Sequence, residues 1–109
     1  MHVTHRIEIY VRTGPERWGW RTAGPAYPDT PDVVASETQL VRALLAYTAM
    51  AARLIAGQVE RFRMVVHTAC TGRLVGHYEW SRSAETGRLV PAAEPWVHWQ
   101  SAEAGVTAA

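Results

Sequence analysis

The 109-residue chain has one cysteine, no lysine and no long apolar run. Cys70 has no partner for an internal disulfide, which is typical of proteins kept in the reducing cytoplasm. The first residues, from Met1 to Arg6, lack the apolar centre of a secretory signal, and no segment has the length needed to span a bilayer. We therefore expect a cytoplasmic protein that does not enter a membrane.

The usual sequence motifs of nucleotide, redox and nucleophile chemistry are also missing. The chain contains no G-x-S-x-G, no G-x-G-x-x-G, no P-loop and no CxxC pair. We expect no metal ion and no cofactor, and we favour a protein that is not an enzyme. The net charge of +1 argues against non-specific adhesion to nucleic acid or to an anionic membrane.

Arg and aromatic residues are abundant instead. All eleven basic residues are Arg, whose planar fork suits carboxylates, phosphates and aromatic faces better than Lys does. Five Trp and four Tyr mean that either the core is rich in Trp or some rings lie on a binding surface. With 48% hydrophobic and 19% charged residues, the composition is globular. We expect a single α+β domain at residues 1–100 and a flexible C-terminal tail at 101–109.

The N-terminal segment alternates with the period of a half-buried strand. Its apolar side carries Val3, His5, Ile7, Ile9 and Val11. Turn residues at 13–16 predict a hairpin with a four-residue loop. This loop would pair Val11 with Trp18, Ile9 with Trp20 and Glu8 with Arg21. Both Trp rings would then join the apolar face.

A single amphipathic helix is predicted after a Pro-rich loop at residues 24–31. Ser36 and Gln39 form a capping box at its start, and Gly57 is placed to end it. Its apolar stripe consists of Leu40, Val41, Leu44, Thr48, Ala51, Ala52 and Ile55. The opposite side, with Ala46, Ala49 and Met50, is poor in charge, which makes self-association as a homodimer one alternative.

A β-meander is predicted after the helix. A three-residue loop at 70–72, with Gly72 left-handed, separates the two faces of a second hairpin. It pairs Phe62 with Trp80, Arg63 with Glu79, Met64 with Tyr78, Val65 with His77, Val66 with Gly76, His67 with Val75 and Thr68 with Leu74. The motif TGRLV at 71–75 recurs at 86–90 and predicts a third strand, which Pro91 breaks or places at an edge. The predicted fold is ββαβββ, an antiparallel sheet with the helix on one face.

The predicted outward faces of the two hairpins collect one sign of charge. The proposed partner-binding residues are Arg6, Tyr10, Arg12, Arg17, Arg21, Arg63, His67, Arg73 and His77. Six Arg against Glu8 and Glu79 give a local charge near +4. Such a face suits an acidic protein surface or, as an alternative, nucleic acid. An ordinary solvated sheet face is the other interpretation.

Two further groups of residues are weaker candidates. His67 and His77 lie diagonally on that face and, with Glu79, are the only acid–base candidates, although an open sheet offers them no third metal ligand. Trp96 and Trp99 either cap the sheet edge or anchor a partner. An enzyme or ligand-binding protein with a Trp/Tyr-lined pocket, using His67 or His77, is the alternative that these residues leave open.

The layout of residues 5–55, with a Trp-containing return strand, a Pro-rich loop and a helix led by Ser36, resembles the HicB-type antitoxin domain. The likeness is one of layout, since that family's acidic Gly segment has only residues 28–31 as a counterpart and the C-terminal meander is extra. We expect a small binding or regulatory protein of a bacterium or phage, similar to antitoxin, immunity or inhibitor proteins.

Overall fold

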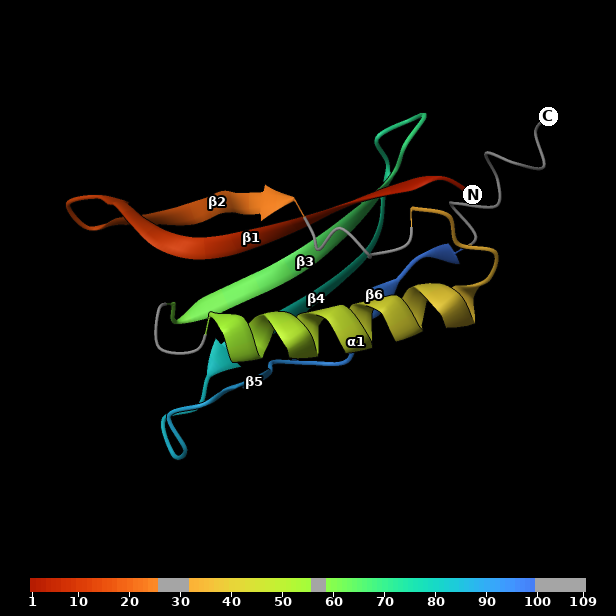
Figure 1. Cartoon of the computed structure of the whole chain (residues 1–109). Coiled ribbons are helices and arrows are strands. Elements are labelled where there is room, and N and C mark those ends of the chain that lie inside the picture. The colour runs from red at the N-terminus through yellow and green to blue at the C-terminus, as the bar shows by residue number, and fades with distance from the viewer. Residues whose placement is uncertain (26–31, 56–58, 100–109) are drawn as a thin grey trace.

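The computed structural model describes residues 1–25, 32–55 and 59–99. Its elements are β1 (Val3–Gly14), β2 (Arg17–Pro25), α1 (Glu37–Leu54), β3 (Arg61–Thr68), β4 (Leu74–Arg82), β5 (Leu89–Pro91) and β6 (Trp96–Val97). They form one antiparallel sheet in the order β2-β1-β3-β4-β5, with β6 also paired to β4, and α1 lies along one face (Figure 1). The predicted ββαβββ architecture is confirmed. Most of the predicted Pro-rich loop, the helix stop at Gly57 and the tail at 101–109 fall outside the described residues.

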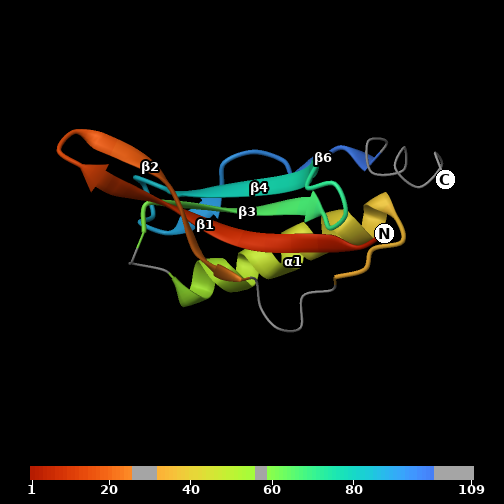
Figure 2. The same ribbon diagram turned by 90° about the horizontal axis from the view of Figure 1, so that it is seen from above.

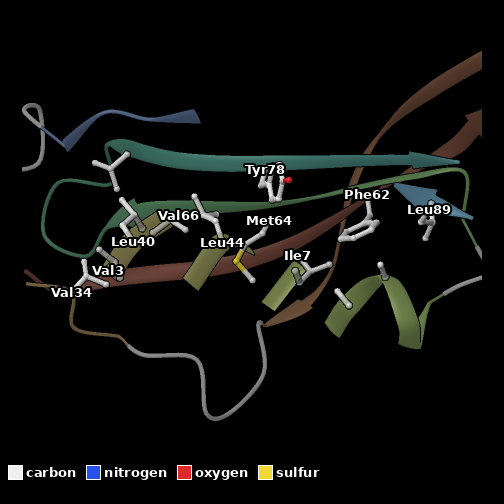
Figure 3. Close-up of a cluster of buried hydrophobic side chains, with 13 residues drawn as sticks. Val3, Ile7, Val34, Leu40, Leu44, Phe62, Met64, Val66, Tyr78 and Leu89 are labelled. Carbon is white, nitrogen blue, oxygen red and sulfur yellow. The ribbon is translucent and has the colours of Figure 1, made fainter. Parts of the chain in front are cut away.

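The pairing of β1 with β3 joins the two hairpins into one sheet. Val3 lies opposite Thr68 and Ile7 opposite Met64, so the apolar sides of both strands face α1. The largest fully buried side chains are Phe62, Leu40, Leu44, Met64, Val34, Val66, Val75 and Thr48. Figure 3 shows this core between the helix and the sheet.

The start of α1 follows the predicted capping box with one change. The Ser36 hydroxyl accepts a hydrogen bond from the backbone N–H of Gln39 at 3.2 Å. The Gln39 side chain accepts in return from the backbone N–H of Ala35 at 2.7 Å, one residue before the cap. Two N–H groups at the helix start are thereby satisfied.

The predicted register of the first hairpin is wrong by one residue. Gly14 pairs with Arg17, so the loop is only two residues long, and an irregularity between Arg12 and Gly14 shifts the pairing. Trp18 therefore lies opposite Arg12 and Trp20 opposite Tyr10. Both Trp rings join the polar side of β1. The physical reason is position: this end of the hairpin extends past α1, where there is no core for the rings to enter (Figure 2).

The second hairpin follows the predicted pairing from Phe62 to Val66. Nearer the loop, His67 lies opposite Leu74 instead of Val75. The N–H of Thr68 donates to the carbonyl of Arg73, so four residues form the loop rather than three. A bulge at Val75 absorbs the extra residue. It buries Val75 and leaves Leu74 exposed, the reverse of the prediction.

The TGRLV repeat is a repeated hairpin loop. In both copies the hydroxyl residue before the loop, Thr68 or Ser83, uses its carbonyl to accept a hydrogen bond from the glycine N–H. Its own N–H donates to the carbonyl of the following Arg. Gly72 and Gly87 take nearly the same left-handed conformation, with φ of 68° and 70°. The second loop leads into β5, the predicted third strand, which ends at Pro91 on the sheet edge.

This geometry predicts which glycine tolerates a side chain. Replacing Gly87 with Ala forces a left-handed backbone on an L-residue, and we expect a loss of about 1–2 kcal/mol in the free energy of unfolding. The control is Gly19→Ala, where φ is not positive and the new methyl meets only the Thr13 methyl at 3.6 Å. Urea denaturation compares the two. Equal stability of both variants would contradict the strained-loop argument.

Candidate functional site

The sheet face opposite α1, called the open face below, carries three of the four ion pairs found among the described residues, together with a group of aromatic rings. The strand registers place on it Thr4, Arg6, Glu8, Tyr10, Arg12, Trp18, Trp20, Arg61, Arg63, Val65, His67, His77 and Glu79. Six of the predicted partner-binding residues are among them: Arg6, Tyr10, Arg12, Arg63, His67 and His77. The sequence interpretation is therefore correct for the position of most of this set.

Three of the predicted residues lie elsewhere. Arg17 pairs with Gly14 and Arg21 with Ile9, which places both on the other side of the hairpin because of the shifted register. Arg73 lies in the loop before β4. Arg61, which was not selected from the sequence, joins the open face. The sequence did contain a signal for this position, because side chains alternate along a strand and Arg61 lies two residues before Arg63.

The charge of the open face is therefore smaller than the sequence suggests. Its Arg residues are Arg6, Arg12, Arg61 and Arg63. Four Arg minus the two carboxylates, Glu8 and Glu79, leave +2 in place of the predicted +4.

Both carboxylates of the open face are bound by Arg. Glu8 is buried, with 8% exposure, and its two oxygens contact Arg6 Nε at 3.2 Å and Arg63 Nε at 2.8 Å. Glu79 accepts a hydrogen bond from Arg61 Nε at 2.8 Å. A carboxylate removed from water is stable only when it is paired in this way. These bonds fix the guanidinium groups on the sheet.

The same guanidinium groups support a set of rings. Arg63 lies 4.0 Å from the centre of the Trp20 ring, and Arg61 lies 4.5 Å from that of Tyr10. Trp18 stacks on Tyr10 with centroids 5.8 Å apart and planes inclined by 14°. We call Tyr10, Trp18, Trp20, Arg61 and Arg63 the aromatic–Arg cluster. Trp18 is its outermost member and is 54% exposed.

The acid–base candidates predicted from the sequence are two histidines with lowered pKa values and one carboxylate that is paired with an Arg. Burial, with a smaller contribution from Arg6, lowers the pKa of His67; burial, with a smaller contribution from Arg63, lowers that of His77. The Glu79 carboxylate is held by Arg61. Within residues 1–25, 32–55 and 59–99, no group of three His, Cys, Asp or Glu is placed to hold a metal ion.

The two C-terminal Trp residues have different positions. Trp96 is 39% exposed and stacks on His77, with centroids 5.2 Å apart. Trp99 is partly buried and packs against the core. Only Trp96 keeps the exposure expected of an anchor.

Two hollows lie on the helix side of the sheet. One, of about 400 Å³, is lined by Val33, Val34, Gln39, Arg42, Ala43, Ala46 and Tyr47. The other, of about 680 Å³, lies between α1, β4 and β5. Neither of these two hollows is lined by His67 or His77. Among the described residues, no helix is long and apolar enough to cross a membrane.

Comparison with protein-family models, with characterised proteins and with solved structures finds no significant match. The likeness of layout to the HicB-type antitoxin domain therefore carries no functional argument.

The Glu8 ion pairs predict a stability effect. Changing Glu8 to Gln removes the carboxylate from Arg63 and Arg6, and we expect a loss of about 1–3 kcal/mol in the free energy of unfolding. The matched control is Glu60→Gln, whose side chain is 71% exposed and pairs with Arg82. There we expect a change below about 1 kcal/mol. Chemical denaturation distinguishes the two, and a larger loss in the control would refute the central role of Glu8.

His5 predicts a pH dependence of stability. It lies opposite Val66, and its Nε2 is buried without a hydrogen-bond partner in the described structure. Burial lowers the pKa of His5 below 6.5, although the negative charge of Asp32 acts in the other direction. The unfolded chain therefore binds the proton more readily, so stability is lost as pH falls through 6.5. We expect His5→Leu to lose less stability than wild type between about pH 7.5 and about pH 5.5. If the wild type and His5→Leu lose the same amount of unfolding free energy between the two pH values, His5 does not contribute to the pH dependence.

Proposed function

We propose that this chain is a non-catalytic binding protein that contacts an acidic, partly apolar patch of a partner protein through the aromatic–Arg cluster. The observation that carries the proposal is the half-exposed Trp18, stacked on Tyr10 at the hairpin end that extends beyond α1 (Figure 1). A large ring left in water on a projecting element is typical of an interface anchor.

The composition of the cluster supports this proposal. Trp, Tyr and Arg are the residues most enriched among those that dominate binding energy at protein interfaces. Arg63 and Arg61 already hold the rings of Trp20 and Tyr10. Because these contacts already restrain the rings, less conformational entropy would be lost when a partner docks.

The preference for an acidic partner comes from two Arg side chains of the open face, Arg12 and Arg6, that can still bind a carboxylate. Arg12 Nε donates only to the backbone carbonyl of Gly14 in the described structure. Arg6 is 46% exposed although it contacts Glu8. These two guanidinium groups border the cluster and suit carboxylates of a partner. Our proposal includes a regulatory role of the antitoxin, immunity or inhibitor kind, exerted through this contact.

Nucleic acid is the second candidate, favoured by one observation. Stacked rings on an open sheet, with Arg planes beside them, also suit unpaired bases. The net charge of +2 on the face is small for this role. Affinity that falls steeply with salt would identify it.

The test compares Trp18→Ala with Leu54→Ala as the matched control. Leu54 is 61% exposed and lies at the end of α1, away from the open face. We expect a discrete protein to be retained from a lysate of the source organism by the tagged wild type and the control. Trp18→Ala should bind it at least about tenfold more weakly. Equal retention by both variants would exclude the cluster, and retained nucleic acid would establish the second candidate.

A further inference from the structure

The hollow of about 680 Å³ between α1, β4 and β5 is lined by three of the eleven Arg residues. Arg53 comes from the last turn of α1, Arg82 from the end of β4 and Arg88 from the loop before β5. No Asp or Glu is among its lining residues in the described structure. Trp80, Gly87, Leu89 and two alanines of α1 form the rest of the wall. The hollow therefore combines positive charge with an apolar surface.

Arg82 is held rigidly in this wall. Its Nη1 donates to the carbonyl of Gly87 and its Nη2 to that of Val59, both at 2.6 Å, and its Nε donates to Glu60 at 3.3 Å. These bonds use three of the five N–H groups of a guanidinium. One N–H on each Nη remains for another acceptor. A guanidinium fixed in this way binds an anion with little further loss of side-chain entropy.

Arg53 and Arg88 supply charge that the described part of the chain does not neutralise. Both are exposed, and neither has an ion pair with a carboxylate among the described residues. Arg88 is carried by a constrained loop, because Ser83 donates its N–H to the Arg88 carbonyl at 2.8 Å and the Arg88 N–H donates to Thr86 Oγ1 at 3.3 Å. Its backbone position is therefore fixed relative to Arg82.

Trp80 gives the hollow an apolar wall and a reporter atom. Its ring is stabilised by Phe62, at a centroid distance of 6.0 Å, and by an edge contact with Tyr78. Its Nε1 is buried without a hydrogen-bond acceptor in the described structure, although buried donors are normally bonded. An acceptor bound beside this ring would change the surroundings of the Nε1 proton.

We propose that this hollow binds a small organic anion. Arg53, Arg82 and Arg88 would hold its phosphate or carboxylate, and Trp80 and Leu89 would contact its apolar body. The site lies on the helix side of the sheet and does not depend on the aromatic–Arg cluster. In this proposal the second TGRLV loop also contributes to the anion site, because it carries Arg88 and its Gly87 carbonyl orients Arg82.

The experiment is a titration of the full chain with phenyl phosphate, followed by the indole N–H signals of the five Trp residues in nitrogen–proton correlation spectra. We expect a saturable shift of the Trp80 signal. Benzoate tests the carboxylate source, inorganic phosphate tests the charged group alone, and benzyl alcohol tests the apolar body alone. Either aromatic anion should bind more tightly than inorganic phosphate, and the alcohol should not shift Trp80.

Two variants and one control decide the assignment. Arg88→Ser and Arg53→Ser each remove one exposed guanidinium and should weaken binding by about tenfold or more. Arg42→Ser removes another exposed Arg from α1 that lines the other hollow, and it should leave binding unchanged. The other four indole signals report whether each variant is folded. No saturable Trp80 shift with either aromatic anion, or equal weakening by Arg42→Ser, would overturn the proposal.

Discussion

The antiparallel pairing of β1 with β3 is the constraint on which the rest of the structure depends. It joins two hairpins that are separated along the chain by α1, and it decides which side of each hairpin faces the helix. The bond between Arg63 and Glu8, 55 residues apart in sequence, lies on this seam. The same β1–β3 register places the apolar side chains of both strands against α1 and their polar side chains on the open face. A slip of β1 by one residue against β3 would move Val3 and Ile7 out of the core and expose them.

Elements set by local chemistry were predictable from the sequence. The helix start follows from Ser36 and Gln39, because a capping box involves neighbouring residues only. The register from Phe62 to Val66 follows because one pairing alone separates apolar from polar side chains. The bulge at Val75 was not predictable, because the loop length and the bulge compensate each other and leave the central pairing unchanged.

The first hairpin shows where the hydrophobic pattern fails. Treating Trp18 and Trp20 as apolar residues favours the register that places them beside Ile9 and Val11. That rule assumes a core along the whole strand, whereas this part of the hairpin extends beyond α1 (Figure 2). There the rings make contacts outside a core: Trp18 stacks on Tyr10, and Arg63 lies over the Trp20 ring. To predict on which side these two rings lie, one must know how far α1 extends along the sheet. No local sequence pattern contains that information.

The number of Arg side chains on a sheet face is larger than the number that are free to bind a partner. Glu8 and Glu79 engage three of the four Arg residues of the open face, and two of these, Arg61 and Arg63, also lie against the aromatic rings. The hollow beside β5 has the opposite arrangement. There Arg82 donates to two backbone carbonyls, which orient a guanidinium without cancelling its charge, and its carboxylate partner is the exposed Glu60. The binding that we propose at the open face would therefore depend mainly on shape and ring contact, and the binding that we propose at the hollow mainly on charge.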